Sequence, residues 1–313
     1  MTAVNVRNLR KTYRHRGKEY KALKGVSFSV KKGEMYGLLG ANGAGKTTTI
    51  NILAGLLTKD SGKADILGRD VEKHEEWVKD RMNVGSAYTW LTGILTVRQN
   101  LKVYGKLYGV KDIDRKIDEL LRQFNITNLQ HTKVYRLSTG QVIRTILCKT
   151  LINNPPVLLL DECTVGLDPE MAQKTRAILK DYQKRQGTTI IFTSHNMLEV
   201  ETLCDRVGIM HNGKIMVEGT PKQIRKLAKK KTIKIDAIGP MPIARALGKL
   251  DLDIIYSKKD TIIFHAPEKL KLPTIINTLV GEKFDIIDMN VRKPTLEDVF
   301  IKLSKGEIRG KAK

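Results

Sequence analysis

The sequence predicts an α/β protein in two parts, a parallel-sheet core with a helical insertion and a small α+β domain of ferredoxin-like order. Strand and helix signals alternate over residues 157–217, as expected for a parallel sheet. Between residues 96 and 124 the apolar residues instead follow a helical period. After residue 220 the pattern runs strand, helix, strand, strand, helix, strand and helix.

The length of 313 residues allows one large and one smaller domain, and the 41% hydrophobic content is that of a globular protein. No apolar run approaches the roughly 18 residues that a membrane helix requires. The N-terminal residues alternate like a strand and lack the apolar centre of a signal peptide. We therefore expect a cytoplasmic protein that does not itself cross a membrane.

The chain is basic, with 56 Lys and Arg against 33 Asp and Glu and a net charge of +23. This excess favours an anionic neighbour such as nucleic acid or a membrane surface. A lysine-rich solvated surface explains it at least as well, because the basic residues are spread along the chain. The cysteines, Cys148, Cys163 and Cys204, are odd in number and show no CxxC spacing, which predicts free thiols.

Local sequence patterns predict the secondary structure and the domain boundaries. Residues 1–36 alternate in two runs separated by Gly25, which predicts strands. We expect residues 1–220 to form the core domain, with its helical subdomain at about 86–150, followed by a basic linker at 221–231. In the second domain, residues 232–304, the predicted elements are strand 232–237, helix 243–250, strands 253–257 and 261–265, helix 271–279, strand 286–291 and helix 295–303. A basic tail, 305–313, follows.

A glycine-rich segment carries the strongest functional signal. It fits the P-loop pattern, follows the apolar run 36–39 and precedes the helical run 49–53. Its residues are Gly40, Ala41, Asn42, Gly43, Ala44, Gly45, Lys46, Thr47 and Thr48. Backbone N–H groups of such a loop surround phosphate oxygens, while Lys46 reaches the β and γ phosphates and the Thr47 hydroxyl ligates Mg²⁺. The segment therefore predicts ATP and Mg²⁺ as ligands.

The apolar run 157–160 ends in two acids, Asp161 and Glu162, the form of a Walker B strand. A buried parallel strand would deliver both carboxylates to the sheet edge beside the P-loop. There Asp161 can hold Mg²⁺ through water and Glu162 can polarise an attacking water.

Between these motifs lies Leu137, Ser138, Thr139, Gly140 and Gln141. Here the sequence resembles the ABC ATPase family, whose signature is usually Leu-Ser-Gly-Gly-Gln, with Thr139 in place of the first glycine. Ser138 suits a helix N-cap that forms an anion site. The resemblance, which spans residues 1 to about 220, implies a P-loop ABC ATPase core. It also implies that this site closes on the γ-phosphate held by a second nucleotide-binding subunit.

Three further residues take their roles from the resemblance. Asp168 matches the D-loop, His195 matches the switch histidine that senses the γ-phosphate, and Tyr13 matches the aromatic residue that stacks on adenine. The family glutamine that links Mg²⁺ to the membrane partner is missing, and by offset Thr89 stands in its place. Cys163 also replaces the usual proline. These departures bear on coupling more than on nucleotide binding.

The segment 292–300 is similar to the ending of the drug-resistance and lipid-exporter branch of ABC ATPases. Thr295 is a good N-cap with Asp298 three residues later, so a capped packing helix explains the same residues. The resemblance implies a transport ATPase that drives export as a pair of such subunits, a homodimer, on separate transmembrane permease subunits, at the inner face of the cell membrane and with no specific nucleic acid. The alternatives are a soluble ABC ATPase acting on ribosomes or nucleic acid, and a partner subunit that hydrolyses poorly.

Overall fold

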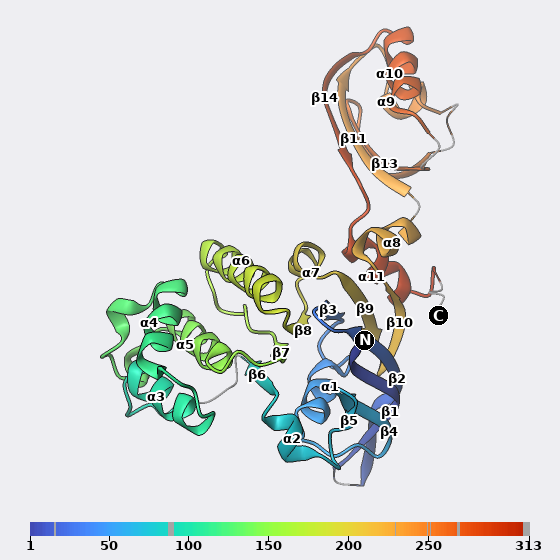
Figure 1. The fold of residues 1–313 in the computed structure, drawn as a ribbon. Helices are drawn as coiled ribbons and strands as arrows, with labels where there is room; N and C mark the ends of the chain where they lie inside the picture. Colours follow the sequence, from blue (N-terminus) through green and yellow to red (C-terminus); the bar gives the residue numbers. More distant parts are fainter. Residues whose placement is uncertain are drawn as a thin grey trace. The chain divides into compact units, whose positions relative to one another are not determined.

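The computed structural model describes residues 1–15, 17–86, 91–228, 230–248, 250, 252–267 and 270–308. The chain forms two compact units, Met1–Pro221 and Lys222–Arg309, coloured from blue to yellow and from yellow to red in Figure 1. The predicted α/β class is confirmed, because the first unit is built on a largely parallel sheet flanked by helices.

A six-stranded sheet forms the centre of the first unit, in the order β10-β9-β3-β8-β7-β6. Only β10 is antiparallel to its neighbour. The strands are β3 (Met35–Leu39), β6 (Met82–Ser86), β7 (Val157–Asp161), β8 (Thr189–Ser194), β9 (Arg206–His211) and β10 (Lys214–Gly219). Strands β3, β7 and β8 are buried along their whole length, as expected for parallel strands covered on both faces. The flanking helices include α1 (Lys46–Leu53), α6 (Pro169–Gln186) and α7 (Met197–Leu203).

The predicted strands near the N-terminus form an antiparallel sheet in the order β2-β1-β4-β5. Its members are β1 (Thr2–His15), β2 (Lys18–Lys31), β4 (Ser61–Ile66) and β5 (Arg69–Asp70), and helix α2 (Glu75–Lys79) follows. Alternate residues of β1 and β2 are buried in one apolar core with α1 and the central sheet. This shared core fixes the β1–β2 hairpin beside the start of α1.

The helical insertion contains α3 (Val97–Leu107), α4 (Ile113–Gln123), the short 3-10 helices η1 (Thr127–Leu129) and η2 (Val134–Arg136), and α5 (Thr139–Leu151). Capping boxes begin α3 at Thr96 and α5 at Ser138. Each box satisfies backbone N–H groups that the first helical turn leaves free. Helix α5 packs against α3, α4 and β6, which joins the insertion to the central sheet.

The second unit has the predicted ferredoxin-like order. It contains β11 (Lys230–Ile238), α9 (Ile243–Ala246), β12 (Asp253–Ser257), β13 (Thr261–Pro267), α10 (Leu272–Gly281), β14 (Asp285–Arg292) and α11 (Leu296–Ser304). Its four strands pair antiparallel in the order β12-β13-β11-β14. Helix α9 is shorter than the expected 243–250.

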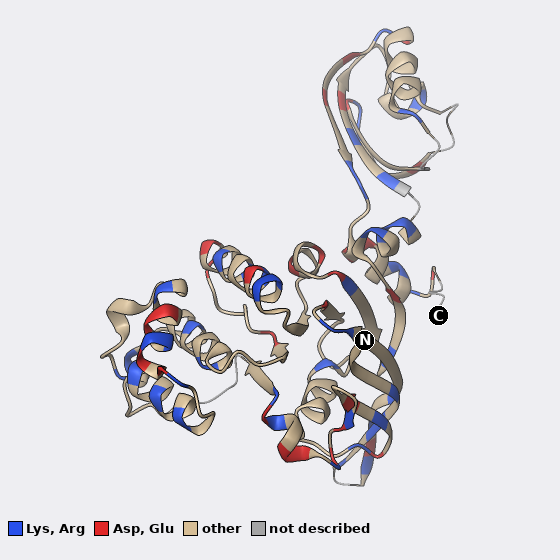
Figure 2. Ribbon diagram, viewed as in Figure 1, with Lys and Arg blue, Asp and Glu red and all other residues tan. Residues whose placement is uncertain are grey.

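The segment 221–231, which the sequence predicts as a basic linker, contains short helices. Helix α8 (Pro221–Arg225) and the 3-10 helix η3 (Lys226–Ala228) occupy this segment, and β11 begins at Lys230. The apolar side chains of Ile224 and Ala228 are buried, so the segment is anchored by packing despite its charge. Figure 2 shows Lys and Arg spread over elements of both units and interspersed with acidic residues, notably along α6.

All three cysteines are free, as predicted, and all three are buried. Burial disfavours the thiolate, so it raises the pKa of Cys148, Cys163 and Cys204. Across the described part of the chain, every helix is too short or too polar to cross a lipid bilayer.

Candidate functional site

The P-loop connects the end of β3 to the start of α1, so its backbone turns at the carboxyl edge of the central sheet. Gly43 and Gly45 have φ angles of 78° and 106°, in the left-handed region that favours glycine. A Cβ at Gly45 would also lie 2.8 Å from the Ala22 carbonyl oxygen. The loop therefore needs glycine at this position for its conformation and for its close contact with β2.

Lys46 is the first residue of α1, and its side chain is only 5% exposed. Its Nζ donates hydrogen bonds to the carbonyl oxygens of Gly40, at 2.8 Å, and Ala41, at 3.3 Å. The ammonium group thus folds back over the loop that precedes it. This position places a buried cation beside the backbone N–H groups of the loop.

Two carboxylates reach the same place from β7. Asp161 is 3% exposed and accepts a hydrogen bond of 2.5 Å from the Thr193 hydroxyl of the adjacent strand β8. Glu162 has a φ of 51°, and its N–H is held by Thr193. The turn out of the strand therefore separates the directions of the two acidic side chains.

Glu162 connects Lys46 to the predicted switch histidine. One carboxylate oxygen lies 3.5 Å from Lys46 Nζ, and the other lies 3.2 Å from Nδ1 of His195. An ionised carboxylate can only accept hydrogen bonds, so this contact requires a proton on Nδ1. His195 follows β8, as predicted.

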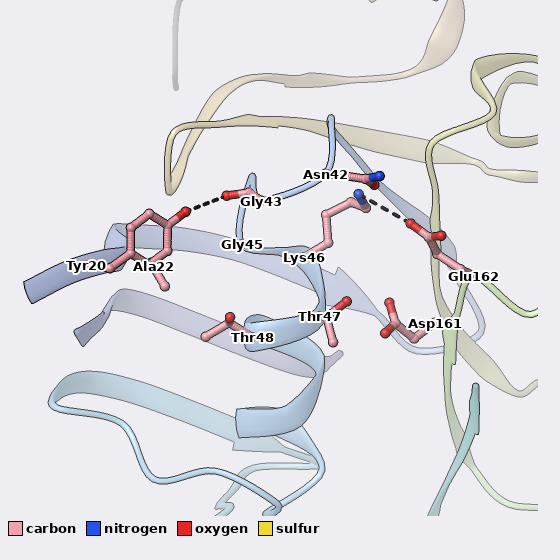
Figure 3. A pocket seen from close by; sticks show the side chains of 10 residues that line it. All are labelled: Tyr20, Ala22, Asn42, Gly43, Gly45, Lys46, Thr47, Thr48, Asp161 and Glu162. Atoms are coloured by element: carbon pink, nitrogen blue, oxygen red, sulfur yellow. Dashed lines mark hydrogen bonds and ion pairs between the residues drawn. The ribbon is translucent and has the colours of Figure 1, made fainter. Parts of the chain in front are cut away.

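The P-loop, Asp161 and Glu162 border a cavity of about 320 Å³, which His195 and Thr193 do not line. Figure 3 shows Lys46 pointing toward Glu162, while the Thr47 hydroxyl and the Asp161 carboxylate point toward each other. The lining residues are Tyr20, Ala22, Asn42, Gly43, Gly45, Lys46, Thr47, Thr48, Asp161 and Glu162. A cation, hydroxyl groups, backbone N–H groups at a helix start and two carboxylates suit a phosphate chain together with a divalent cation.

The signature residues form a separate feature. The Ser138 hydroxyl accepts a hydrogen bond from the Gln141 N–H at 3.4 Å, and the Gln141 side chain accepts one from the Ser138 N–H at 2.9 Å. A Cβ at Gly140 would lie 3.4 Å from the Gly166 carbonyl oxygen, so α5 begins against the predicted D-loop turn. Asp168 caps α6 by accepting a hydrogen bond from Met171 N. Leu137–Gln141 and Asp168 do not line the cavity described above.

Several predicted residues do not line the cavity, and the sequence analysis did not name several residues that belong to the site. Gly40, Ala41, Ala44 and Tyr13 do not line it, although the Tyr13 hydroxyl is 3.4 Å from Thr48 Oγ1. Tyr20, Ala22 and Thr193 were not predicted. Tyr20 lies opposite Tyr13 in the register of the β1–β2 hairpin, and the sequence alone did not fix that register. The predicted Thr89 lies outside the described residues.

Comparisons with known proteins agree with this geometry. Residues 23–165 match the family described as ABC transporter, and residues 219–304 match ATP-binding protein DrrA1-3-like, C-terminal domain. The chain is 31% identical to the linearmycin resistance ATP-binding protein LnrL of Bacillus subtilis, over 98% of this chain and 99% of that protein. The chain belongs to the ABC transporter ATP-binding family.

Further relatives place this ABC ATPase among subunits of export systems. The daunorubicin resistance ATP-binding protein DrrA2 of Streptomyces coeruleorubidus is 32% identical over 91% of each chain. A solved ATP-binding subunit of an ABC transporter is 27% identical with a TM-score of 0.66, covering 72% of this chain and 92% of that one. The chain is therefore a nucleotide-binding, transport-coupled ATPase subunit, and the soluble alternative is not favoured.

Proposed function

We propose that this chain binds ATP with Mg²⁺ in the P-loop cavity and hydrolyses it to drive export through separate permease subunits. The observation that carries the proposal is the convergence of Lys46, Thr47, Asp161 and Glu162 on one cavity at the sheet edge. The chain contributes the catalytic groups, and its membership of the ABC transporter ATP-binding family supports the link to transport.

In the first step of the proposed mechanism, Lys46 exchanges its ionic partner, Glu162, for the phosphates of ATP. In the present arrangement, Lys46 lies 3.5 Å from the Glu162 carboxylate and is nearly buried. Phosphate oxygens entering the loop would take over this cation and release Glu162 from it. Glu162 would then orient and deprotonate the attacking water, and His195, already at 3.2 Å, would hold the carboxylate and contact the γ-phosphate.

Thr47 and Asp161 are the residues that would hold Mg²⁺. The buried Asp161 carboxylate accepts a hydrogen bond from the neutral Thr193 hydroxyl, and a buried charge held by a neutral group favours a cation nearby. No group of three or more His, Cys, Asp or Glu side chains that could hold a metal occurs among the described residues, which suits an ion shared with the phosphates. The bound ion would neutralise charge that develops on the transferred phosphoryl group.

Two kinds of protein partner belong to the proposal. Ser138 and the N-terminal end of α5 lie outside the P-loop cavity and would complete the site of a second nucleotide-binding subunit. A relative fold, 24% identical with a TM-score of 0.64, was solved as a dimer with ADP and Pi. The permease subunits would place the pair at the inner face of the membrane. The relatives' names refer to resistance to different compounds, linearmycin and daunorubicin, so they select no cargo here.

The test compares Lys46→Ala with Lys59→Ala. Lys59 is a matched control because it pairs with Glu72 away from the cavity. ATP with Mg²⁺ at a hundred times its Kd stabilises a folded protein by about 2.7 kcal/mol, which a thermal shift detects. We expect this shift in the wild type and in Lys59→Ala and its loss in Lys46→Ala. Equal shifts in all three proteins would contradict the assignment of the site.

A further inference from the structure

Helix α6 is joined to α7 by a row of polar side chains. Arg176, Lys180 and Gln183 follow one another on α6 at spacings of four and three residues, so they lie on one face of the helix. Arg176 pairs with Glu199, in the first turn of α7, at 2.8 Å, and Lys180 donates a hydrogen bond of 3.0 Å to the Leu203 carbonyl oxygen at the end of α7. The contacts of this row therefore reach both ends of α7.

One part of the row is fixed to the central sheet through Asp205. Lys180 and Gln183 donate hydrogen bonds to its two carboxylate oxygens at 2.9 Å and 3.0 Å. The Met35 N–H, at the start of β3, donates to the same carboxylate at 2.9 Å. Asp205 therefore anchors this part of α6 to the amino end of β3.

Glu199 connects the other end of the row to the carboxyl edge of the sheet. Its side chain is nearly buried. One carboxylate oxygen accepts hydrogen bonds from the hydroxyl groups of Thr164, at 2.8 Å, and Ser194, at 3.1 Å, while the other accepts one from Arg176. Glu199 thus holds the turn after β7 and the end of β8 with one oxygen and holds α6 with the other.

These two segments carry the proposed catalytic residues. Glu162 lies two residues before Thr164. His195 lies between Ser194 and Asn196, and the Asn196 N–H donates a hydrogen bond of 2.9 Å to the Ser194 hydroxyl. Displacement of the carboxylate that joins the two segments would therefore move the backbone of both catalytic residues.

We propose that Arg176 is a positioning residue of the hydrolysis step, because its ion pair makes the backbone of Glu162 and His195 follow the movement of α6. Helix α6 begins at Asp168, and the turn before it lies against the start of α5. In the proposed function, Ser138 at this start meets the nucleotide of the second subunit. The inference rests on that function and adds a path from the signature to the residues that hydrolyse the chain's own ATP.

The surroundings of the ion pair make its charges effective. The side chains of Arg176 and Glu199 are 24% and 8% exposed, so water and salt screen this pair less than they screen surface pairs. Without the guanidinium, the Glu199 carboxylate would keep its two hydroxyl donors and lose its cation. A nearly buried charge in that state favours hydration, so the carboxylate and the two segments should shift. Lys46 is held separately, by carbonyl oxygens of its own loop.

The experiment measures kcat for ATP hydrolysis and the Kd of ADP with Mg²⁺ on the full chain. Arg176→Met should lower kcat about tenfold, as expected for a lost coupling contact, and should leave the Kd within about twofold because the P-loop is intact. Arg176→Lys, which keeps the charge, should recover most of the turnover. Lys174→Met is the matched control, because Lys174 pairs with Glu170 on the exposed side of the same helix.

A double-mutant cycle with Glu199→Gln tests whether the two residues act through each other. The amide oxygen of glutamine can still accept from the hydroxyl groups of Thr164 and Ser194, so this variant removes mainly the charge that faces Arg176. If the ion pair carries the effect, Glu199→Gln should also lower kcat about tenfold, and the double variant should fall no further. Independent effects would instead multiply to about a hundredfold.

Three results would overturn the inference. One is a kcat for Arg176→Met equal to that of the wild type, and another is a loss of about a hundredfold in the double variant. The third is a loss of ADP affinity that matches the loss of kcat, which would indicate a general effect on the fold. Failure of the proposed function gives a different result, because the wild type would then not hydrolyse ATP and Lys46→Ala would bind ADP as the wild type does.

Discussion

The two units of the chain differ in what they bury. The first unit encloses polar side chains in its interior, among them Lys46, Asn83, Asp161, Thr193 and Glu199. Among the described residues of the second unit, by contrast, every fully buried side chain is apolar. Buried polar groups are costly unless they are hydrogen-bonded or paired, so a fold retains them where chemistry needs them. The comparison locates the chemistry in the first unit and assigns mainly packing to the core of the second.

Within the first unit, several buried polar groups form one connected set. Glu199 accepts hydrogen bonds from Thr164 and Ser194 and pairs with Arg176 at 2.8 Å. These contacts hold the turns that follow β7 and β8, where Glu162 and His195 lie. The interior polarity thus supports the geometry of the carboxyl edge of the sheet.

Among changes that test the contrast between the two units, we expect Glu162→Gln to have the largest effect on ATP turnover. If Glu162 activates water, as we propose, removal of its carboxylate should lower ATP turnover by at least about a hundredfold. ATP affinity should be retained, because Lys46 and the loop remain. Steady-state hydrolysis and equilibrium binding are the measurements, with Glu170→Gln on the exposed start of α6 as the matched control. Full turnover in Glu162→Gln would break the assignment of chemistry to this edge.

Phe264→Ala, in the second unit, should instead lower stability without changing ATP binding. Phe264 is fully buried in the apolar core of the second unit, and such a truncation costs about 3–5 kcal/mol in the free energy of unfolding. Both tryptophans, Trp77 and Trp90, belong to the first unit. Urea unfolding followed by circular dichroism should therefore show the loss, while the tryptophan fluorescence transition and the ATP affinity stay unchanged.

The control for this experiment is Ile254→Ala on the exposed strand β12, which should move neither transition. A matching shift in tryptophan fluorescence for Phe264→Ala would show that the two units unfold together. That result would contradict our inference that the first unit carries the chemistry while the core of the second serves mainly packing.

A smaller effect is expected from Thr193→Val. The substitution removes the hydroxyl that donates to Asp161 at 2.5 Å. If Asp161 holds Mg²⁺, as we propose, loss of this supporting contact should weaken metal binding about 10- to 100-fold. The concentration of Mg²⁺ that gives half-maximal ATPase activity should rise accordingly. Thr188→Val is the matched control, because Thr188 directly precedes β8 and its buried hydroxyl donates to the Pro155 carbonyl oxygen. A similar change in both variants would indicate a general packing effect.

Local patterns were sufficient to predict the P-loop, the acidic end of β7 and the order of the second unit. The loop has a glycine pattern whose conformation is set within a few residues, and strand alternation shows directly which side chains are buried. The contact of Tyr20 with Gly43 and that of Thr193 with Asp161 join residues far apart in the sequence. Such contacts depend on strand order and register, which a single sequence leaves open.

The linker at 221–231 shows a different limitation. Its basic composition suggested a solvated connection, but charge density does not report on the few apolar residues that decide packing. The segment forms short helices, and the side chains of Ile224 and Ala228 are both buried. In this basic segment, the two apolar residues were therefore a better guide to packing than the surrounding lysines.

The burial of all three cysteines has a practical consequence for spectroscopy. Since Cys148, Cys163 and Cys204 lie inside the fold and their thiols are held in the protonated form, maleimide dyes and spin labels should not react with the native chain. A cysteine introduced at an exposed position would then carry the label alone. Distances between chosen pairs of positions could be followed through an ATP cycle with every native cysteine left in place.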